Sequence, residues 1–285
     1  MTFYGQERSL QTNIERQPFK QNDQSECADA REKGMESMMA PGNGNGNYSD
    51  CVLIDLNTQI DFCKAEGAYP VANRDELVPA LRRVIAWVKR NRIPVVSSVE
   101  SHRLWEVSNS SLPALYCIDG TPGQRKVDFT LFPNRVWIEV DNTLTVPTDL
   151  FRECQQVIFR KRTDDLLANP KADRFLTHLT AVEFVLFGNC VESAVKYLTL
   201  GLLARNRRVT VVLDACGHWD PAAADLAVRQ ISAKGANLIT VAELVERRQI
   251  SLNRYSTKSK PNGSHNGNGS EHHDSNGNGS NGHDE

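Results

Sequence analysis

The stretch CVLIDL at residues 51–56 is an apolar, β-branched run that ends in a carboxylate, Asp55, followed by one more leucine. Similar apolar runs follow it along the chain, at residues 94–98, 136–140, 156–159, 184–187, 209–213 and 238–241. Strands that alternate with amphipathic helices are typical of a parallel sheet covered on both faces. We therefore expect an α/β domain with three layers (α/β/α) and a mostly parallel, Rossmann-like sheet of about six strands.

Apolar spacing predicts three helices between these runs. The first repeats its apolar residues at helical spacing between Leu77 and Val88, and Asn73 with Glu76 forms a possible capping box before it. The second is expected from Cys190 to about Arg205. The third is expected from Pro221 to Lys234, with Gly235 as its C-cap.

The two ends of the chain differ in composition from the centre. Residues 1–48 and 253–285 are polar and rich in Asn, Gly and Ser, so we expect both to be disordered. The remaining residues, 49–252, suit a single domain. The formal net charge of −2 argues against nucleic acid or an anionic membrane as a partner, and favours a small-molecule substrate. Seven cysteines without paired spacing and no long apolar run indicate reduced thiols in the cytosol.

Chemically capable residues follow several of the expected strands. In parallel α/β sheets the ligand crevice lies beyond the carboxyl ends of the strands, which makes Asp55, Glu100, His102, Lys161 and Cys190 the candidates. Asp55 closes an apolar run, so its carboxylate needs a cation nearby, and Lys161 is the residue we expect to supply it. The alternatives are a turn-forming Asp55 and a solvated Lys161.

A thiol at a helix start completes this set. With Asn189 as N-cap, Cys190 becomes the first helical residue, where the helix dipole and the free N–H groups favour a thiolate and can bind an oxyanion. The alternative is a Cys190 that serves as a small core residue.

Several segments in this order resemble the isochorismatase-like cysteine hydrolase superfamily, which includes nicotinamidases, other amidases and isochorismatase. They lie at residues 52–63, 98–102, 116–124, 161–165, 188–195 and 208–216. The resemblance implies a triad of Asp55, Lys161 and Cys190 that hydrolyses the C–N bond of a small amide through a thioester. It also implies a homo-oligomer.

The segment around Cys190 departs from the family pattern. A gapless alignment from Gly188 puts Ala194 at the place of the family's nucleophile, and Cys190 lies one helical turn earlier on the same face. Three interpretations stay open: a nucleophile shifted by one turn, hydrolysis of a vinyl ether by Asp55 without a cysteine, and a catalytically silent ligand-binding protein.

The expected metal site departs from the pattern as well. Nicotinamidases bind a divalent ion through an Asp and two His residues, and the corresponding places here hold Glu100, His102 and Tyr116. No cofactor is required by this interpretation; Glu100 and His102 either hold a zinc-type ion or line the pocket. The residues expected to contact the substrate are Asn189, Ala194, Tyr116, His218 and Trp219.

Overall fold

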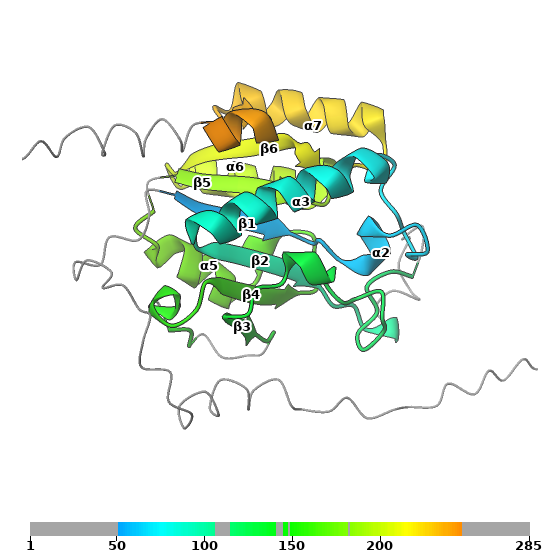
Figure 1. Cartoon of the computed structure of the whole chain (residues 1–285), viewed down its shortest axis with the longest axis horizontal. Helices are drawn as coiled ribbons and strands as arrows, with labels where there is room; N and C mark the ends of the chain where they lie inside the picture. Colours follow the sequence, from blue (N-terminus) through cyan, green and yellow to red (C-terminus); the bar gives the residue numbers. More distant parts are fainter. Residues whose placement is uncertain (1–50, 106–114, 141–144, 148, 182, 247–285) are drawn as a thin grey trace, which may run out of the picture. The chain divides into compact units, whose positions relative to one another are not determined.

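A computed structural model describes residues 51–105, 115–140, 145–147, 149–181 and 183–246 of the chain. Its centre is one sheet of seven parallel strands in the order β3-β4-β2-β1-β5-β6-β7 (Figure 1). The strands are β1 (Cys51–Leu56), β2 (Val95–Glu100), β3 (Arg135–Ile138), β4 (Gln156–Lys161), β5 (Glu183–Gly188), β6 (Arg208–Cys216) and β7 (Asn237–Ile239). The predicted fold class is confirmed, and all the predicted strands join one sheet.

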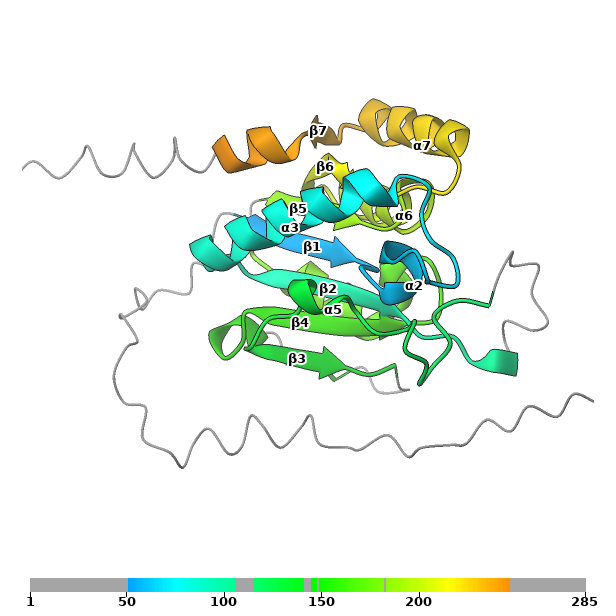
Figure 2. The same cartoon turned by 45° about the vertical axis from the view of Figure 1, so that its right-hand side comes forward.

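Helices cover both faces of this sheet. The α-helices are α2 (Ile60–Cys63), α3 (Arg74–Asn91), α5 (Pro170–His178), α6 (Lys196–Ala204) and α7 (Pro221–Ala233), and short 3-10 turns are η1 (Asp128–Thr130), η2 (Leu150–Arg152) and η3 (Leu166–Ala168). Buried side chains of α3 pack on one face, and those of α5, α6 and α7 pack on the other. Figure 2 shows α2 beyond the carboxyl end of β1, where the crevice of such a sheet is expected.

The strand β1 fixes which face carries the carboxylate of Asp55. Side chains alternate along a strand, so Val52, Ile54 and Leu56 enter the core beneath α5 and α6. Leu53 and Asp55 then point to the face covered by α3. In the sheet, Asp55 lies beside Ser97 of β2 and Phe187 of β5.

The predicted helices are confirmed in position, but two of their details are wrong. The side chain of Asn73 forms no cap hydrogen bond with α3; it accepts from the backbone N–H of His218 and donates to the carbonyl of Cys216. The second helix is not continuous from Cys190, because a π-helical turn, η4 (Val191–Val195), precedes α6. Gly235 follows α7 with a φ of 97°, as a C-cap requires.

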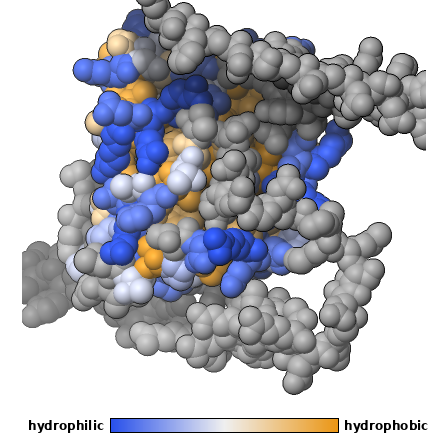
Figure 3. Space-filling view, turned by 90° about the vertical axis from the view of Figure 1, so that its left-hand side faces the viewer, coloured by the Kyte–Doolittle hydropathy of each residue, from blue (hydrophilic) through white to orange (hydrophobic). Residues whose placement is uncertain are grey.

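The predicted terminal segments, 1–48 and 253–285, lie outside the described residues. Among the helices that are described, none is both long and apolar enough to span a bilayer. The end of the sheet opposite to the crevice presents hydrophilic residues mixed with smaller hydrophobic areas (Figure 3).

Candidate functional site

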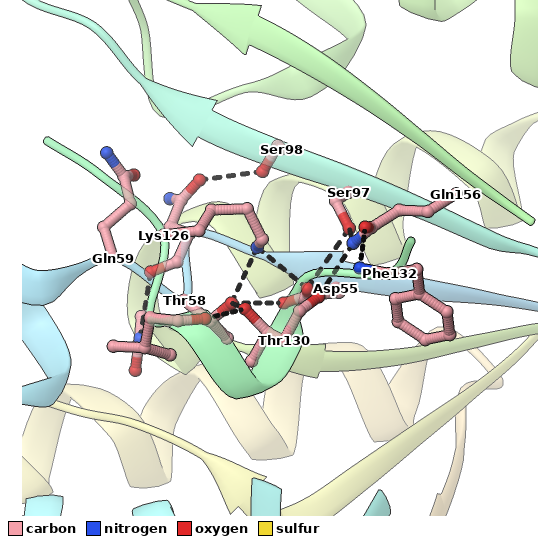
Figure 4. A network of polar contacts seen from close by, with 12 residues as sticks. Asp55, Thr58, Gln59, Ser97, Ser98, Lys126, Thr130, Phe132 and Gln156 are labelled. Carbon is pink, nitrogen blue, oxygen red and sulfur yellow. Dashed lines mark hydrogen bonds and ion pairs between the residues drawn. The ribbon is translucent and has the colours of Figure 1, made fainter. Parts of the chain in front are cut away.

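A buried ion pair between Asp55 and Lys126 lies at the carboxyl end of β1 (Figure 4). The Lys126 Nζ is 2.8 Å from Asp55 Oδ2 and 2.7 Å from the hydroxyl of Thr58. The Thr58 hydroxyl in turn donates to Asp55 Oδ1 over 2.8 Å, and the Ser97 hydroxyl donates to Oδ2 over 3.2 Å. Neither charged side chain is exposed to solvent. The carboxylate is therefore compensated by one cation and two hydroxyl groups.

The loop that carries Lys126 is fastened to the sheet at two points. Lys126 forms a β-bridge with Gln59, and the neighbouring Val127 N–H donates to the carbonyl of Thr58. Further along, the Gln156 amide donates to the carbonyl of Thr130 and accepts from the N–H of Phe132. These bonds fix the loop that carries Lys126 against β4 and against the segment that follows β1.

The predicted pairing of Asp55 with Lys161 is wrong, and the strand register explains why. Asp55 lies level with Ser97 and, through it, with Ile158 of β4. Lys161 is three residues beyond Ile158, which is about 10 Å along the strand, and an odd step also turns its side chain to the other face. The residue opposite Lys161 is Glu100, and the two form a buried ion pair at 3.0 Å.

Sequence reasoning missed Lys126. The residue follows Arg125 in a loop rather than a strand, so its sequence surroundings resemble a solvated basic turn. The usable signal was indirect: a buried Asp55 needs a cation, but the sequence around Asp55 does not say which lysine supplies it.

The Glu100 carboxylate is enclosed by donors. Its Oε1 accepts from Lys161 at 3.0 Å and from the Asn57 amide at 2.6 Å, while its Oε2 is 3.1 Å from His102 Nε2. Burial alone raises the pKa of the Glu100 carboxyl, but the Lys161 ammonium and the His102 hydrogen bond together lower it below its ordinary value. The charge of Glu100 is thus balanced within the protein.

The expected metal site does not fit these residues. A divalent ion bound to Glu100 would lie next to the Lys161 ammonium, and the imidazole nitrogen expected to bind it faces Glu100 instead. Burial raises the pKa of the Tyr116 phenol, so this side chain stays neutral and supplies no anionic ligand. Within the described residues no group of three metal-binding side chains is present.

Cys190 lies in an apolar environment. It is buried in the hydrophobic cluster that also contains Phe62, Tyr116 and Phe187. Its backbone is extended, so it precedes the helical turn and is not the first helical residue predicted. Burial raises the pKa of its thiol well above the ordinary value, and the negative charge of Glu192 contributes to the increase. Among the described residues its sulfur forms no hydrogen bond with Asp55 or any lysine, so the predicted thiolate has no stabilising partner there.

The neighbouring residues take other positions than expected. Asn189 does not cap the helix; its amide donates to the carbonyl of Asn57 and to the sulfur of Cys63. Ala194, also buried, lies within η4 among the aliphatic residues beneath α6.

An alkaline titration tests the state of the buried thiols. Burial raises the pKa of Cys63 and of Cys216 from the ordinary 9.0 to about 12. Below pH 9 both thiols are protonated in the folded and unfolded chain; above it only the unfolded chain loses protons. The free energy of unfolding should then fall with rising pH by up to about 1.4 kcal/mol per pH unit for each thiol.

Urea unfolding between about pH 8 and pH 11 measures this slope. Cys63→Ala serves as the control and should reduce it, because one of the titrating thiols is gone. An identical slope in the variant would contradict the prediction for Cys63.

Aromatic rings gather beside the Glu100 network. Tyr69 stacks on Trp219 with ring centroids 4.6 Å apart and on Tyr116 at 5.4 Å. Phe62 packs against both Tyr116 and Trp219, and His102 meets the edge of Tyr116 at 5.4 Å. The structure therefore brings together Tyr116 and Trp219, two of the residues predicted to contact the substrate. His218 instead bonds through its backbone to Ala72 and Asn73, the two residues that precede α3.

Comparison with known proteins assigns the chain to a family. The family model of the isochorismatase domain matches residues 51–243. An isochorismatase-like hydrolase from Alkaliphilus metalliredigens is 17% identical, with a TM-score of 0.56, over 70% of this chain and 99% of that chain.

Two further solved structures share the fold. A pyrazinamidase of Pyrococcus horikoshii in complex with zinc is 18% identical and a nicotinamidase from Bacillus subtilis 16% identical; each has a TM-score of 0.54 and covers 67% of this chain and 99% of that chain. No curated protein matches the chain. The match of the family model over most of the described residues shows that the chain belongs to the isochorismatase family, as the sequence motifs indicated.

Proposed function

We propose that this protein hydrolyses an acid-labile C–O bond of a small molecule, as in a vinyl ether, without a cysteine nucleophile. The observation that carries the proposal is the buried pair of Asp55 and Lys126 at 2.8 Å. At the place that corresponds to the family nucleophile the chain has Ala194, which lies in the aliphatic core beneath α6 and offers no thiol. Vinyl-ether hydrolysis needs a proton donor and a water molecule, but no side chain that forms a covalent bond.

The ion pair can perform both proton transfers of such a reaction. The pair gives one proton to the electron-rich carbon of the substrate, which leaves a positively charged oxocarbenium carbon. Water attacks that carbon and its released proton returns to the pair; in the hemiketal so formed, the hydroxyl proton passes to the leaving oxygen as the C–O bond breaks, which gives a carbonyl product and an alcohol. Thr58 and Ser97 hold the Asp55 carboxylate in one orientation throughout.

The test compares two substitutions. Asp55→Asn should reduce turnover of a vinyl-ether panel by at least about 100-fold, since one proton-transfer group is lost. Cys190→Ala should leave turnover nearly unchanged. Asp75→Asn is the matched control, because that carboxylate is exposed on α3 and, in the described part of the chain, forms an ion pair with Arg74 alone.

An amide panel distinguishes this proposal from the thioester route of the sequence-based expectation. Turnover of amides that disappears in a folded Cys190→Ala variant, or an acyl adduct on Cys190 detected by mass spectrometry, would refute the cysteine-independent mechanism.

A second candidate function is binding without catalysis. Both carboxylate oxygens of Asp55 already accept hydrogen bonds within the protein, which favours this candidate. The stacked rings of Tyr69, Trp219 and Tyr116 favour it as well. Thermal stabilisation by a small carboxylate, with no turnover on either panel, would support this candidate instead.

A further inference from the structure

The ammonium of Lys161 lies at the centre of a complete set of acceptors. Its Nζ donates to Glu100 Oε1 at 3.0 Å, to the carbonyl of Thr163 at 2.8 Å and to the carbonyl of Asp164 at 3.2 Å. An ammonium has three N–H donors, so each has a partner. The side chains of Lys161 and Glu100 are 1% and 2% exposed, which leaves no room for water to replace these bonds.

The surroundings of this nitrogen resemble those of a bound cation. One carboxylate and two carbonyl oxygens converge on it, with an imidazole on the far oxygen of the same carboxylate. Oxygen ligands of this kind suit hard divalent ions, and the imidazole suits zinc. The observed separations are those of N–H···O bonds, and are longer than the roughly 2.0–2.6 Å of metal–oxygen bonds.

We propose that Lys161 acts as a built-in cation that replaces a divalent ion at Glu100 and His102. The ammonium neutralises the buried carboxylate and, through it, fixes the His102 ring and the Asn57 amide. The ammonium occupies the site whether or not metal is present, and the wild-type protein therefore binds no stoichiometric zinc there. This inference is independent of the proposed function, because its readout is metal binding and not turnover.

Removal of the ammonium should create a metal site. In a Lys161→Ala variant the oxygens of Glu100, Thr163 and Asp164 lose their ammonium donor, while His102 Nε2 remains beside the other oxygen of Glu100. Full-length protein freed of metal by a chelator is titrated with Zn²⁺ by calorimetry and with Co²⁺ by visible absorption. The variant should bind about one equivalent, with a rise in its melting temperature, whereas the wild type should bind none.

Two controls make the result specific. Glu100→Gln in the Lys161→Ala background should remove the new site, because it takes away the anionic ligand. Lys126→Ala should not gain one, since its partner carboxylate, Asp55, has hydroxyl partners and, among the described residues, no imidazole partner.

Each outcome bears on the proposal. It is overturned if the wild type binds one equivalent of Zn²⁺ that Glu100→Gln removes, or if folded Lys161→Ala binds none. Should Lys161→Ala be unfolded without metal, circular dichroism during Zn²⁺ addition decides: recovery of the helical signal supports the proposal, and its absence overturns it.

Discussion

Replacement of Lys126 by methionine is expected to lower the free energy of unfolding by about 3–5 kcal/mol. The methionine keeps much of the apolar stem but removes the charge, so the Asp55 carboxylate is left with two hydroxyl donors and no cation in a site without solvent. An uncompensated buried charge costs far more than the pair itself contributes. Urea unfolding followed by circular dichroism measures the difference.

A double variant shows whether the loss comes from the stranded charge. The double variant Asp55→Asn, Lys126→Met removes both charges. Its loss of unfolding free energy should therefore be smaller than the sum of the losses in the two single variants. Lys64→Met is the matched control: its pair with Glu66 is exposed at 3.8 Å, and the change should stay within about 0.5 kcal/mol. Equal effects of Lys126→Met and Lys64→Met would contradict a buried pair.

The second large effect is expected at Gly188, the last residue of β5. Its φ is 114°, and a Cβ added there would come within 2.1 Å of the Leu56 carbonyl oxygen. Since that atom belongs to the backbone of the central strand β1, it cannot turn away as a side chain does. Gly188→Ala should therefore destabilise the protein by about 3–5 kcal/mol, from the strained φ and the forced separation of two strands.

Gly235 provides the control for this prediction. Its φ of 97° is similarly unfavourable for alanine, but a Cβ there would meet no atom within 4 Å. Gly235→Ala should then cost only the conformational part, about 1–3 kcal/mol. The excess in Gly188→Ala, measured in the same unfolding experiments, reports the contact with Leu56. Equal losses of unfolding free energy in Gly188→Ala and Gly235→Ala would mean that the contact of the added Cβ with Leu56 does not destabilise the protein.

The sequence was most informative where one periodicity dominates. The run at 51–56 is the observed β1, and the apolar spacing from Leu77 to Val88 lies inside α3. The helix α5 was missed, although Asn169 caps it with its side chain and Pro170 occupies its first turn. Both are recognisable start signals, but the segment is short and follows directly on another turn.

The candidate site was harder to predict, because it depends on contacts between distant segments. The position of Asp55 at the carboxyl edge follows from one strand alone. Its partner depends on where a loop folds back, and the hydrogen bonds of that loop, from Gln156 to Thr130 and from Val127 to the carbonyl of Thr58, follow no sequence pattern. The same holds at Cys190: spacing predicted a regular helix start, whereas Ser193 takes a non-helical conformation within η4.

The two outermost strands of the sheet, β3 and β7, are short: Arg135–Ile138 and Asn237–Ile239. A strand edge is a template on which another chain can add its own strand, and the hydrogen bonds gained grow with the length of that edge. Short edge strands offer few backbone hydrogen bonds to an added strand, so extension of the sheet from one molecule into the next is disfavoured. Copies of this protein that associate should therefore meet through their helices and loops.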